Sequence, residues 1–367
     1  MPESTDCIQP RGTRCGVSGT VLKSPPMLDD QAIQKMPKAE VHLHLEGTTA
    51  PETLWAMAKR HGAPLPAASL EELRSLYEFE SFDKFIELWL AMCSCLKSAE
   101  DYEQMADGFV AECRRQNIRY VEAHFTPYNH ERFGFGGERA LDIVTRRLQS
   151  AERDGGPVTR LILDIPSEAA DEAGPYTADL LEHLVNPIVV AIGLGGPEAG
   201  FPRQQFEPYF DRARRAGYPA VAHAGETGGA EHVREVVERL KARRVQHGVH
   251  AVDDPATLRM LAEREICCDV ALTSNVCLTS FTDLPNHPLL RMLEAGVPAT
   301  LSTDDPPFFS TDLVREYTLA RDELGLSSAQ LWELNLNGLR FGLAETGLRR
   351  RLMDEFEGAG RELGIMD

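Results

Sequence analysis

Apolar residues along the chain gather in short runs that are separated by longer segments of helical periodicity. The run at residues 188–192 is apolar throughout and rich in β-branched residues, as expected of a strand buried on both faces. The predicted strands span residues 41–46, 119–125, 160–165, 188–194, 220–223, 244–247, 267–272 and 299–302. The helical patterns between them include residues 138–153, 204–216, 231–239 and 255–264. This alternation predicts an α/β fold, a (β/α)8 TIM barrel with eight parallel strands inside a ring of helices.

The connection between the first two predicted strands is far longer than a single crossover helix requires. Residues 52–117 contain several helical patterns, including 82–96 and 100–115, and are predicted to form a helical cap inserted after the first strand. The large apolar residues of the cap recur near helical spacing: Phe82, Phe85, Trp89 and Leu96. This stripe either faces a planar ligand or packs the cap onto the barrel, and we favour packing.

The rest of the chain, residues 31–367, is predicted to form one barrel domain. Extra helices at 329–337 and 343–362 follow the last strand. Residues 1–30 contain Pro, Ser and Gly but no apolar segment of the kind found in a secretory signal, so we expect a disordered tail.

The net charge, the hydropathy and the cysteines limit the classes of partner and of protein that are expected. The net charge of −19 argues against nucleic acid or an anionic membrane surface as a partner. No apolar run reaches the roughly 18 residues of a membrane-spanning helix. The eight cysteines include no Cys-x-x-Cys pair, which predicts free thiols in a cytoplasmic protein instead of a disulfide framework. The oligomeric state stays open.

Four short polar segments lie at the ends of predicted strands: His42-Leu43-His44, His223-Ala224-Gly225-Glu226, Gln246-His247-Gly248 and Thr303-Asp304-Asp305-Pro306. Alternate residues of a strand point to the same face, so the two imidazoles of the first segment project together. In a TIM barrel the carboxyl ends of all eight strands meet at one rim. We therefore expect the four segments to converge, although each alone could be a buried core histidine, a helix start or a turn.

The residue types in these segments suit a zinc site with acid–base groups beside it. Imidazole nitrogen and carboxylate oxygen are good zinc ligands where thiolate is absent. The predicted ligands of one Zn²⁺ per chain are His42, His44, His223 and Asp304. Glu226 follows on the loop above its strand, where burial would let its carboxyl carry a proton. His247 is placed to stabilise developing charge, and Asp305 is left for the substrate.

The same segments, in this order, resemble the adenosine deaminase family of metal-dependent purine aminohydrolases. The resemblance runs from residue 36 to about residue 343 and is carried by residues 36–47, 223–226, 273–275 and 302–306. It implies one zinc ion, Glu226 as the proton donor to purine N1, and His247 as the residue that orients the attacking water. It further implies the following substrate contacts: Asp305 with N7, the backbone of Gly196 with N3, and His44 and Glu46 with the part of the substrate carried by N9.

The chain departs from the family pattern at Gln246, at Glu46 and at residues 269–271, which affects the expected substrate more than the expected reaction. We expect zinc-dependent hydrolytic deamination at C6 of adenosine or an N9-substituted adenine, so the expected partner is a purine nucleoside. Deamination of adenine or aminodeoxyfutalosine is an alternative, and a catalytically silent nucleoside-binding protein is another. Residues 188–196 lack the Lys or Glu that bridges two metals in related barrels, which favours a single metal.

Overall fold

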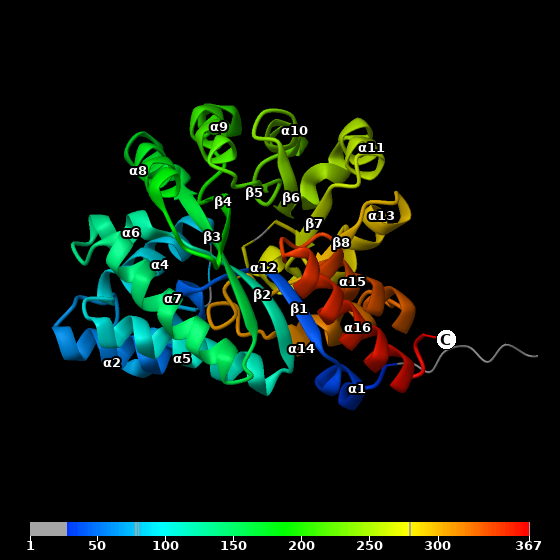
Figure 1. Ribbon diagram of the computed structural model, residues 1–367, viewed down its shortest axis with the longest axis horizontal. Helices are drawn as coiled ribbons and strands as arrows, with labels where there is room; N and C mark the ends of the chain where they lie inside the picture. Colours follow the sequence, from blue (N-terminus) through cyan, green and yellow to red (C-terminus); the bar gives the residue numbers. More distant parts are fainter. Residues whose placement is uncertain (1–27, 78, 80, 279, 367) are drawn as a thin grey trace, which may run out of the picture.

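The computed structural model describes residues 28–77, 79, 81–278 and 280–366. Eight parallel strands pair in the order of the sequence, and a bridge between Leu43 and Asp304 brings the last strand to the first (Figure 1). The strands are β1 (Lys38–His44), β2 (Ile118–Phe125), β3 (Val158–Pro166), β4 (Val189–Gly195), β5 (Ala220–Ala224), β6 (Ala242–His247), β7 (Cys267–Val270) and β8 (Ala299–Leu301). The predicted TIM barrel is confirmed.

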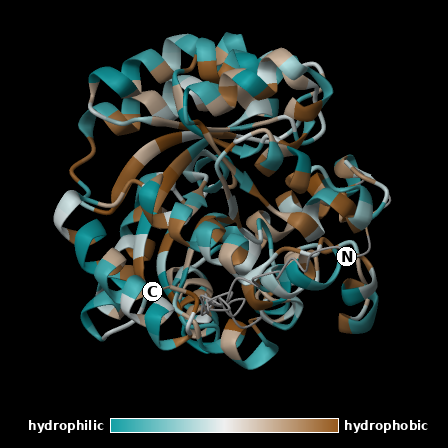
Figure 2. Ribbon diagram, turned by 90° about the vertical axis from the view of Figure 1, so that its right-hand side faces the viewer, coloured by the Kyte–Doolittle hydropathy of each residue, from teal (hydrophilic) through white to brown (hydrophobic). Residues whose placement is uncertain are grey.

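Helices surround the strands, with α8 to α11 following one another around the outside of the barrel in Figure 1. The helices are α1 (Asp30–Lys35), α2 (Pro51–His61), α3 (Leu70–Ser75), α4 (Phe82–Cys95), α5 (Ala99–Arg115), α6 (Pro127–Arg132), α7 (Gly137–Arg153), α8 (Ala170–His183), α9 (Glu207–Arg215), α10 (Ala230–Glu238), α11 (Pro255–Glu263), α12 (Leu272–Cys277), α13 (Leu289–Glu294), α14 (Leu313–Asp322), α15 (Ser328–Arg340) and α16 (Thr346–Glu362). Figure 2 shows largely hydrophobic strands and hydrophilic residues on the outer helices, as the amphipathic pattern predicts.

Two strands end two residues earlier than predicted. The first strand was expected to reach residue 46 but ends at His44, because the chain turns there into a 3-10 helix at Glu46–Thr48. The seventh was expected to reach residue 272 but ends at Val270, and α12 begins at Leu272. A short apolar run has the same composition in a strand and in the first turn of a buried helix, so the pattern could not mark the boundary.

Helices α2 to α5 fill the long connection between β1 and β2, as the cap was predicted to do. Helix α4 packs its aromatic residues against the segment that follows β8: the rings of Phe85 and Phe309 are 5.4 Å apart, and Phe85 and Phe308 are 5.8 Å apart. Phe85 and Trp89 are buried. The packing role of the aromatic stripe is therefore confirmed at Phe85.

Most of the predicted tail lies outside the described residues, but its last three residues join the folded part. Leu28 is buried and its N–H donates to Ser328 Oγ at 2.8 Å, and Asp29 caps α1 through its side chain. The folded part thus includes residues that were assigned to the tail. The six described cysteines are free, and five of them are buried. In the part of the chain that the structure describes, no helix has the length and apolar character to cross a membrane.

A fully buried ionic cluster lies inside the barrel between β2, β6 and β7. The guanidinium of Arg244 donates to Asp269 Oδ2 at 2.8 Å and to Glu122 Oε2 at 2.6 Å. Its Nη2 donates to the carbonyl of Val41 at 3.1 Å. These bonds join four positions of the barrel wall and leave the two carboxylates paired with one cation.

Candidate active site

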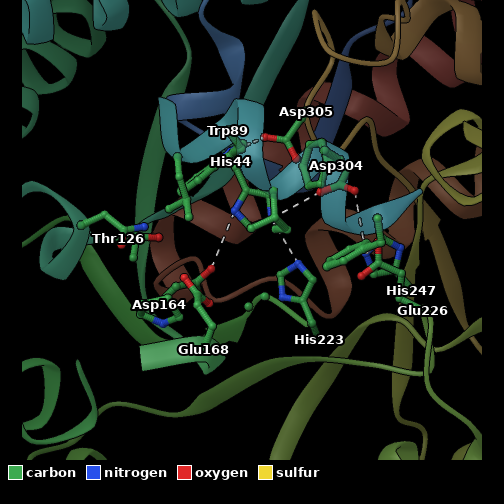
Figure 3. A pocket seen from close by; sticks show the side chains of 18 residues that line it. His44, Trp89, Thr126, Asp164, Glu168, His223, Glu226, His247, Asp304 and Asp305 are labelled. Atoms are coloured by element: carbon green, nitrogen blue, oxygen red, sulfur yellow. Dashed lines mark hydrogen bonds and ion pairs between the residues drawn. The ribbon is translucent and has the colours of Figure 1, made fainter. Parts of the chain in front are cut away.

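A pocket opens at the carboxyl ends of the strands and is closed on one side by α4 (Figure 3). It contains about 540 Å³ of empty space. Side chains from β1, β3, β5, β6 and the segment after β8 point into it, together with cap residues Phe82, Phe85 and Trp89. The four sequence segments predicted to converge therefore do so, because the barrel brings all strand ends to one rim.

The four predicted metal ligands present one atom each to a common point. His223 Nε2 lies 3.2 Å from His42 Nε2 and 3.1 Å from His44 Nε2. Asp304 Oδ1 lies 3.4 Å from His42 Nε2 and 3.3 Å from His44 Nε2. A tetrahedron whose corners lie about 2.0–2.1 Å from a zinc ion has edges of about 3.3–3.4 Å. Four of the six distances between the predicted ligand atoms therefore match the edges of a tetrahedron around a zinc-sized ion.

Hydrogen bonds on the far side of two rings show which nitrogen is free to bind. His42 Nδ1 lies 3.0 Å from the carbonyl of Asp269, and His223 Nδ1 lies 2.7 Å from the carbonyl of Leu194. A carbonyl only accepts, so each ring carries its hydrogen on Nδ1 and has a lone pair on Nε2. The two lone pairs face each other at 3.2 Å, an arrangement that a cation between them relieves.

His247 belongs to a second possible ligand set, in which it joins His42, His223 and Asp304 within 4.8 Å. Its Nε2 lies 3.8 Å from Asp304 Oδ2 and 3.5 Å from Glu226 Oε1. These distances exceed the edge of a zinc tetrahedron, so the shorter contacts of His44 make it the better fourth ligand. His247 lies instead beside Glu226, the other residue predicted to be catalytic.

Two residues at this rim have strained backbones. His247 and Asp304 have φ angles of 59° and 66°, in the left-handed region that residues other than glycine seldom adopt. Such conformations cost about 1–3 kcal/mol each and persist where surrounding contacts impose them. At Asp304 those contacts include Ser274 Oγ, which donates to Oδ2 at 2.6 Å and leaves Oδ1 to the ligand cluster.

The turn that carries Glu226 is held by a buried carboxylate, Glu198. Glu198 Oε1 accepts the backbone N–H groups of Glu226 at 2.8 Å and of Thr227 at 3.0 Å, and Oε2 accepts the N–H of Gly225 at 2.9 Å. Burial alone would raise the pKa of Glu198, but the bond from His232 and these amides outweigh it and lower the pKa. An ionised carboxylate thus fixes the backbone on which the predicted proton donor stands.

Burial has the opposite effect on Glu226. Its carboxyl is buried, and burial followed by the neighbouring Asp304 raises its pKa well above the usual value. A raised pKa favours the protonated form, which is the form that a proton donor needs.

Asp305 contacts the cap as well as the pocket. Its Oδ1 accepts a hydrogen bond from Trp89 Nε1 at 3.0 Å, which Figure 3 shows as a dashed line. Burial raises the pKa of Asp305 well above its usual value. Packing of the cap was the favoured role of Trp89 and contact with a ligand the alternative; Trp89 lines the pocket and orients a predicted substrate-binding carboxyl. The helical spacing could not reveal this bond, because it joins residues 216 positions apart.

Gly196 lines the pocket with a φ of 82°, and a Cβ there would lie 2.7 Å from Glu168 Oε2. A side chain at this position would therefore collide with a pocket residue, so glycine is required.

Glu46, predicted to face the N9 substituent, does not line the pocket. It is completely buried, and its Oε1 accepts the N–H of Thr126 at 2.8 Å and lies 3.2 Å from His130 Nε2. The 3-10 turn after β1 directs it toward the end of β2, which the strand pattern had not anticipated.

Sequence reasoning missed Asp164 and His124. Asp164 Oδ1 lies 2.8 Å from His124 Nδ1, and Oδ2 lies 3.7 Å from Nδ1 of the ligand His44. The distance to His44 is too long for a hydrogen bond, so Asp164 adjoins this predicted ligand as a neighbouring carboxyl group while it binds His124 directly. The available signal was an acidic residue inside the apolar run of the third strand, where an unpaired charge is costly.

Comparison with known proteins agrees with this geometry. Residues 37–359 match the adenosine deaminase family. The aminodeoxyfutalosine deaminase of Streptomyces coelicolor is 37% identical over 327 residues, which cover 89% of this chain and 84% of that protein. The adenine deaminase of Bordetella avium is 36% identical over 312 residues, 83% of this chain and 96% of that protein. A solved amidohydrolase from Burkholderia ambifaria with bound zinc has a TM-score of 0.84 at 25% identity, covering 94% of this chain and 97% of that one.

The barrel gathers a cluster of imidazoles and carboxylates that could hold a metal ion. With a match that extends over nearly all of the described residues, the chain belongs to the adenosine deaminase family. It is accordingly a purine deaminase, a hydrolase that removes the amino group at C6.

Proposed function

We propose that the protein hydrolyses the C6 amino group of adenosine or another N9-substituted adenine, with one zinc ion per chain. Water adds at C6, the amino group leaves as ammonia, and a 6-oxopurine remains. The observation that carries this proposal is the convergence of His42, His44, His223 and Asp304 at tetrahedral spacing beside a buried, protonated Glu226.

Zinc, when bound, activates water as a nucleophile at neutral pH. The remaining roles belong to the chain. Glu226 gives its proton to N1, while His247 orients the attacking water from the side on which it adjoins Glu226. Asp305, protonated because it is buried, donates a hydrogen bond to N7, and the backbone of Gly196 contacts N3. The cap residues Phe82 and Phe85 cover the purine and exclude water.

The relatives favour a second candidate for the substrate. The two similar proteins named above are an aminodeoxyfutalosine deaminase and an adenine deaminase. Aminodeoxyfutalosine carries a substituent on N9, as adenosine does, whereas adenine does not. The pocket residue Glu168, which lies beside Gly196, is close to the edge of the purine where this difference falls.

A panel of purines tests the proposal. The zinc-loaded protein is incubated with adenosine, aminodeoxyfutalosine and adenine, and ammonia release gives kcat/KM for each. We expect an N9-substituted compound to give the highest value. A higher value for free adenine would contradict the nucleoside assignment but not the reaction. Tight binding of adenosine without ammonia release from any purine would instead identify a catalytically silent binding protein.

A further inference from the structure

Two residues outside the pocket form a hydrogen-bonded chain that ends on His247. Asn275, in α12, places Nδ2 3.0 Å from His247 Nδ1. Its Oδ1 lies 3.1 Å from His287 Nε2, and His287 Nδ1 accepts the backbone N–H of Leu289 at 3.2 Å. All three side chains are buried. The chain thus runs from a backbone amide near α13 to the catalytic rim.

The backbone N–H of Leu289 fixes the direction of every hydrogen bond in this series. A backbone N–H only donates, so His287 Nδ1 accepts and has no hydrogen. Burial lowers the pKa of His287 to about 3, so its neutral ring carries its one hydrogen on Nε2. That hydrogen is donated to Asn275 Oδ1, which orients the amide and turns its NH2 group toward His247. His247 Nδ1 is therefore an acceptor.

His247 consequently differs from the predicted ligands in the nitrogen that holds the hydrogen. His42 and His223 donate from Nδ1 to carbonyls and keep a lone pair on Nε2. In neutral His247 the hydrogen is on Nε2, which is buried and has no hydrogen-bond partner among the described residues. This N–H lies 3.5 Å from Glu226 Oε1, at the side of the pocket where the reaction takes place.

We propose that Asn275 and His287 are positioning residues that hold His247 in the tautomer with hydrogen on Nε2. His247 then donates a hydrogen bond into the pocket and is prevented from competing with His44 as a metal ligand. The inference rests on the proposed function for its catalytic consequence, but the tautomer itself is a property of the folded protein. It also explains why the buried Nε2–H of His247 has no hydrogen-bond partner among the described residues.

Replacing the NH2 group of the Asn275 side chain tests the proposal. Asn275→Asp exchanges the donating NH2 for an oxygen that accepts, so His247 Nδ1 takes up the hydrogen and Nε2 is left with a lone pair. A wrong tautomer of a catalytic histidine costs up to about 10⁴-fold in a serine protease. We expect a loss of about 10²–10⁴-fold in kcat with KM changed less than about threefold and zinc retained. Asn286→Asp, at an exposed position of the same segment, is the matched control and should keep its kcat.

A pair of substitutions at His287 separates hydrogen bonding from packing. The amide nitrogen of Gln occupies nearly the place of Nε2 in His, so His287→Gln can still donate to Asn275. His287→Leu fills the space but cannot donate. We expect His287→Gln to stay within about fivefold of the wild-type kcat and His287→Leu to lose at least about 30-fold. Equal losses of kcat in the two variants would overturn the positioning role proposed for His287.

The tautomer can be read directly, without turnover. Two-bond ¹H–¹⁵N correlation spectra of the zinc-loaded, histidine-labelled protein distinguish Nδ1–H from Nε2–H, and His247→Gln assigns the signal. We expect Nε2–H in the wild type and Nδ1–H in Asn275→Asp. A wild-type ring with hydrogen on Nδ1, or an Asn275→Asp ring that keeps Nε2–H, would overturn the inference. Failure of the wild type to release ammonia would instead overturn the proposed function. The spectrum would still show which nitrogen of His247 carries the hydrogen.

Discussion

Two buried polar clusters lie within the same barrel, and they differ in how their hydrogen bonds close. The cation of Arg244 lies between Glu122 and Asp269, so donors meet acceptors and opposite charges pair. At the rim, the lone pairs of His42 and His223 face each other, and Asp304 adds a carboxylate to the same point. The side chains of both clusters are buried, so burial alone does not separate them.

The difference lies in what each cluster requires from outside the chain. The charges of the Arg244 cluster pair with each other and need no ligand. The rim cluster has an excess of acceptors around one point, which a bound cation would satisfy. Because unsatisfied buried polar groups are rare in folded proteins, such an excess indicates a ligand site. The variants below test this comparison, from the largest expected effect to the smallest.

Removing a ligand should abolish activity while leaving the fold intact. His42→Ala takes away one corner of the tetrahedron, so we expect less than about 10% of the zinc content and a loss of more than about 10⁴-fold in kcat/KM. Elemental analysis and ammonia release measure the two effects. His250→Ala, near His247 in sequence but bonded to Asp253 at the surface, should keep both. Full zinc content in His42→Ala would remove this residue from the ligand set.

Neutralising the proton donor should separate metal binding from turnover. In Glu226→Gln the ligands are untouched, so we expect one zinc per chain, but the side chain can no longer transfer a proton. General acid–base groups typically contribute about 10²–10⁴-fold, which is the loss expected in kcat. Glu231→Gln, an exposed change on the following helix, serves as the control. A variant that keeps most of its kcat would exclude Glu226 from the mechanism.

Breaking the self-satisfied cluster should reduce stability and not the chemistry of the folded protein. Arg244→Met leaves the buried carboxylates of Glu122 and Asp269 without their shared cation, which costs about 3–5 kcal/mol in the free energy of unfolding. Chemical denaturation measures the loss, with the exposed Arg259→Met as a control expected to change stability by less than about 0.5 kcal/mol. The folded fraction of Arg244→Met should still bind zinc. Loss of zinc without loss of stability would show that the Arg244 cluster serves the metal site and not the fold.

Weakening the support of the Glu226 turn should give the smallest effect. Glu198→Gln keeps the shape of the side chain. The variant has one acceptor oxygen, whereas two oxygens of Glu198 accept the backbone amides in the wild type. A displacement of about 1 Å at a catalytic group can cost about 10²-fold, so we expect kcat to fall by about 10–100-fold with zinc retained. The control is Glu238→Gln on the exposed side of α10. In the Glu226→Gln background the same change should have little further effect, because both act on one proton transfer. Additive losses would show that Glu198 acts elsewhere.

Local patterns in the sequence determined the fold and the inner part of the site. Eight apolar runs alternating with amphipathic segments lead to the barrel because burial imposes periodicity on each element separately. The His42–His44 pair projects to one side because a strand alternates faces, and barrel topology gathers all strand ends at one rim. The predicted ligands, Glu226 and His247 could therefore be chosen from motif and position alone.

Only the tertiary structure decided which partners these residues meet. Trp89 reaches Asp305, Asp164 lies behind His44, and Glu198 holds the turn of Glu226. Glu46, which the family resemblance implied to face the substrate, accepts a hydrogen bond from Thr126 after the end of β2, because a 3-10 turn follows β1. Periodicity records which face of an element is buried, but it carries no information on what lies opposite. That depends on the packing of elements far apart in the chain, as does the Asn275–His287 pair that sets the hydrogen of His247.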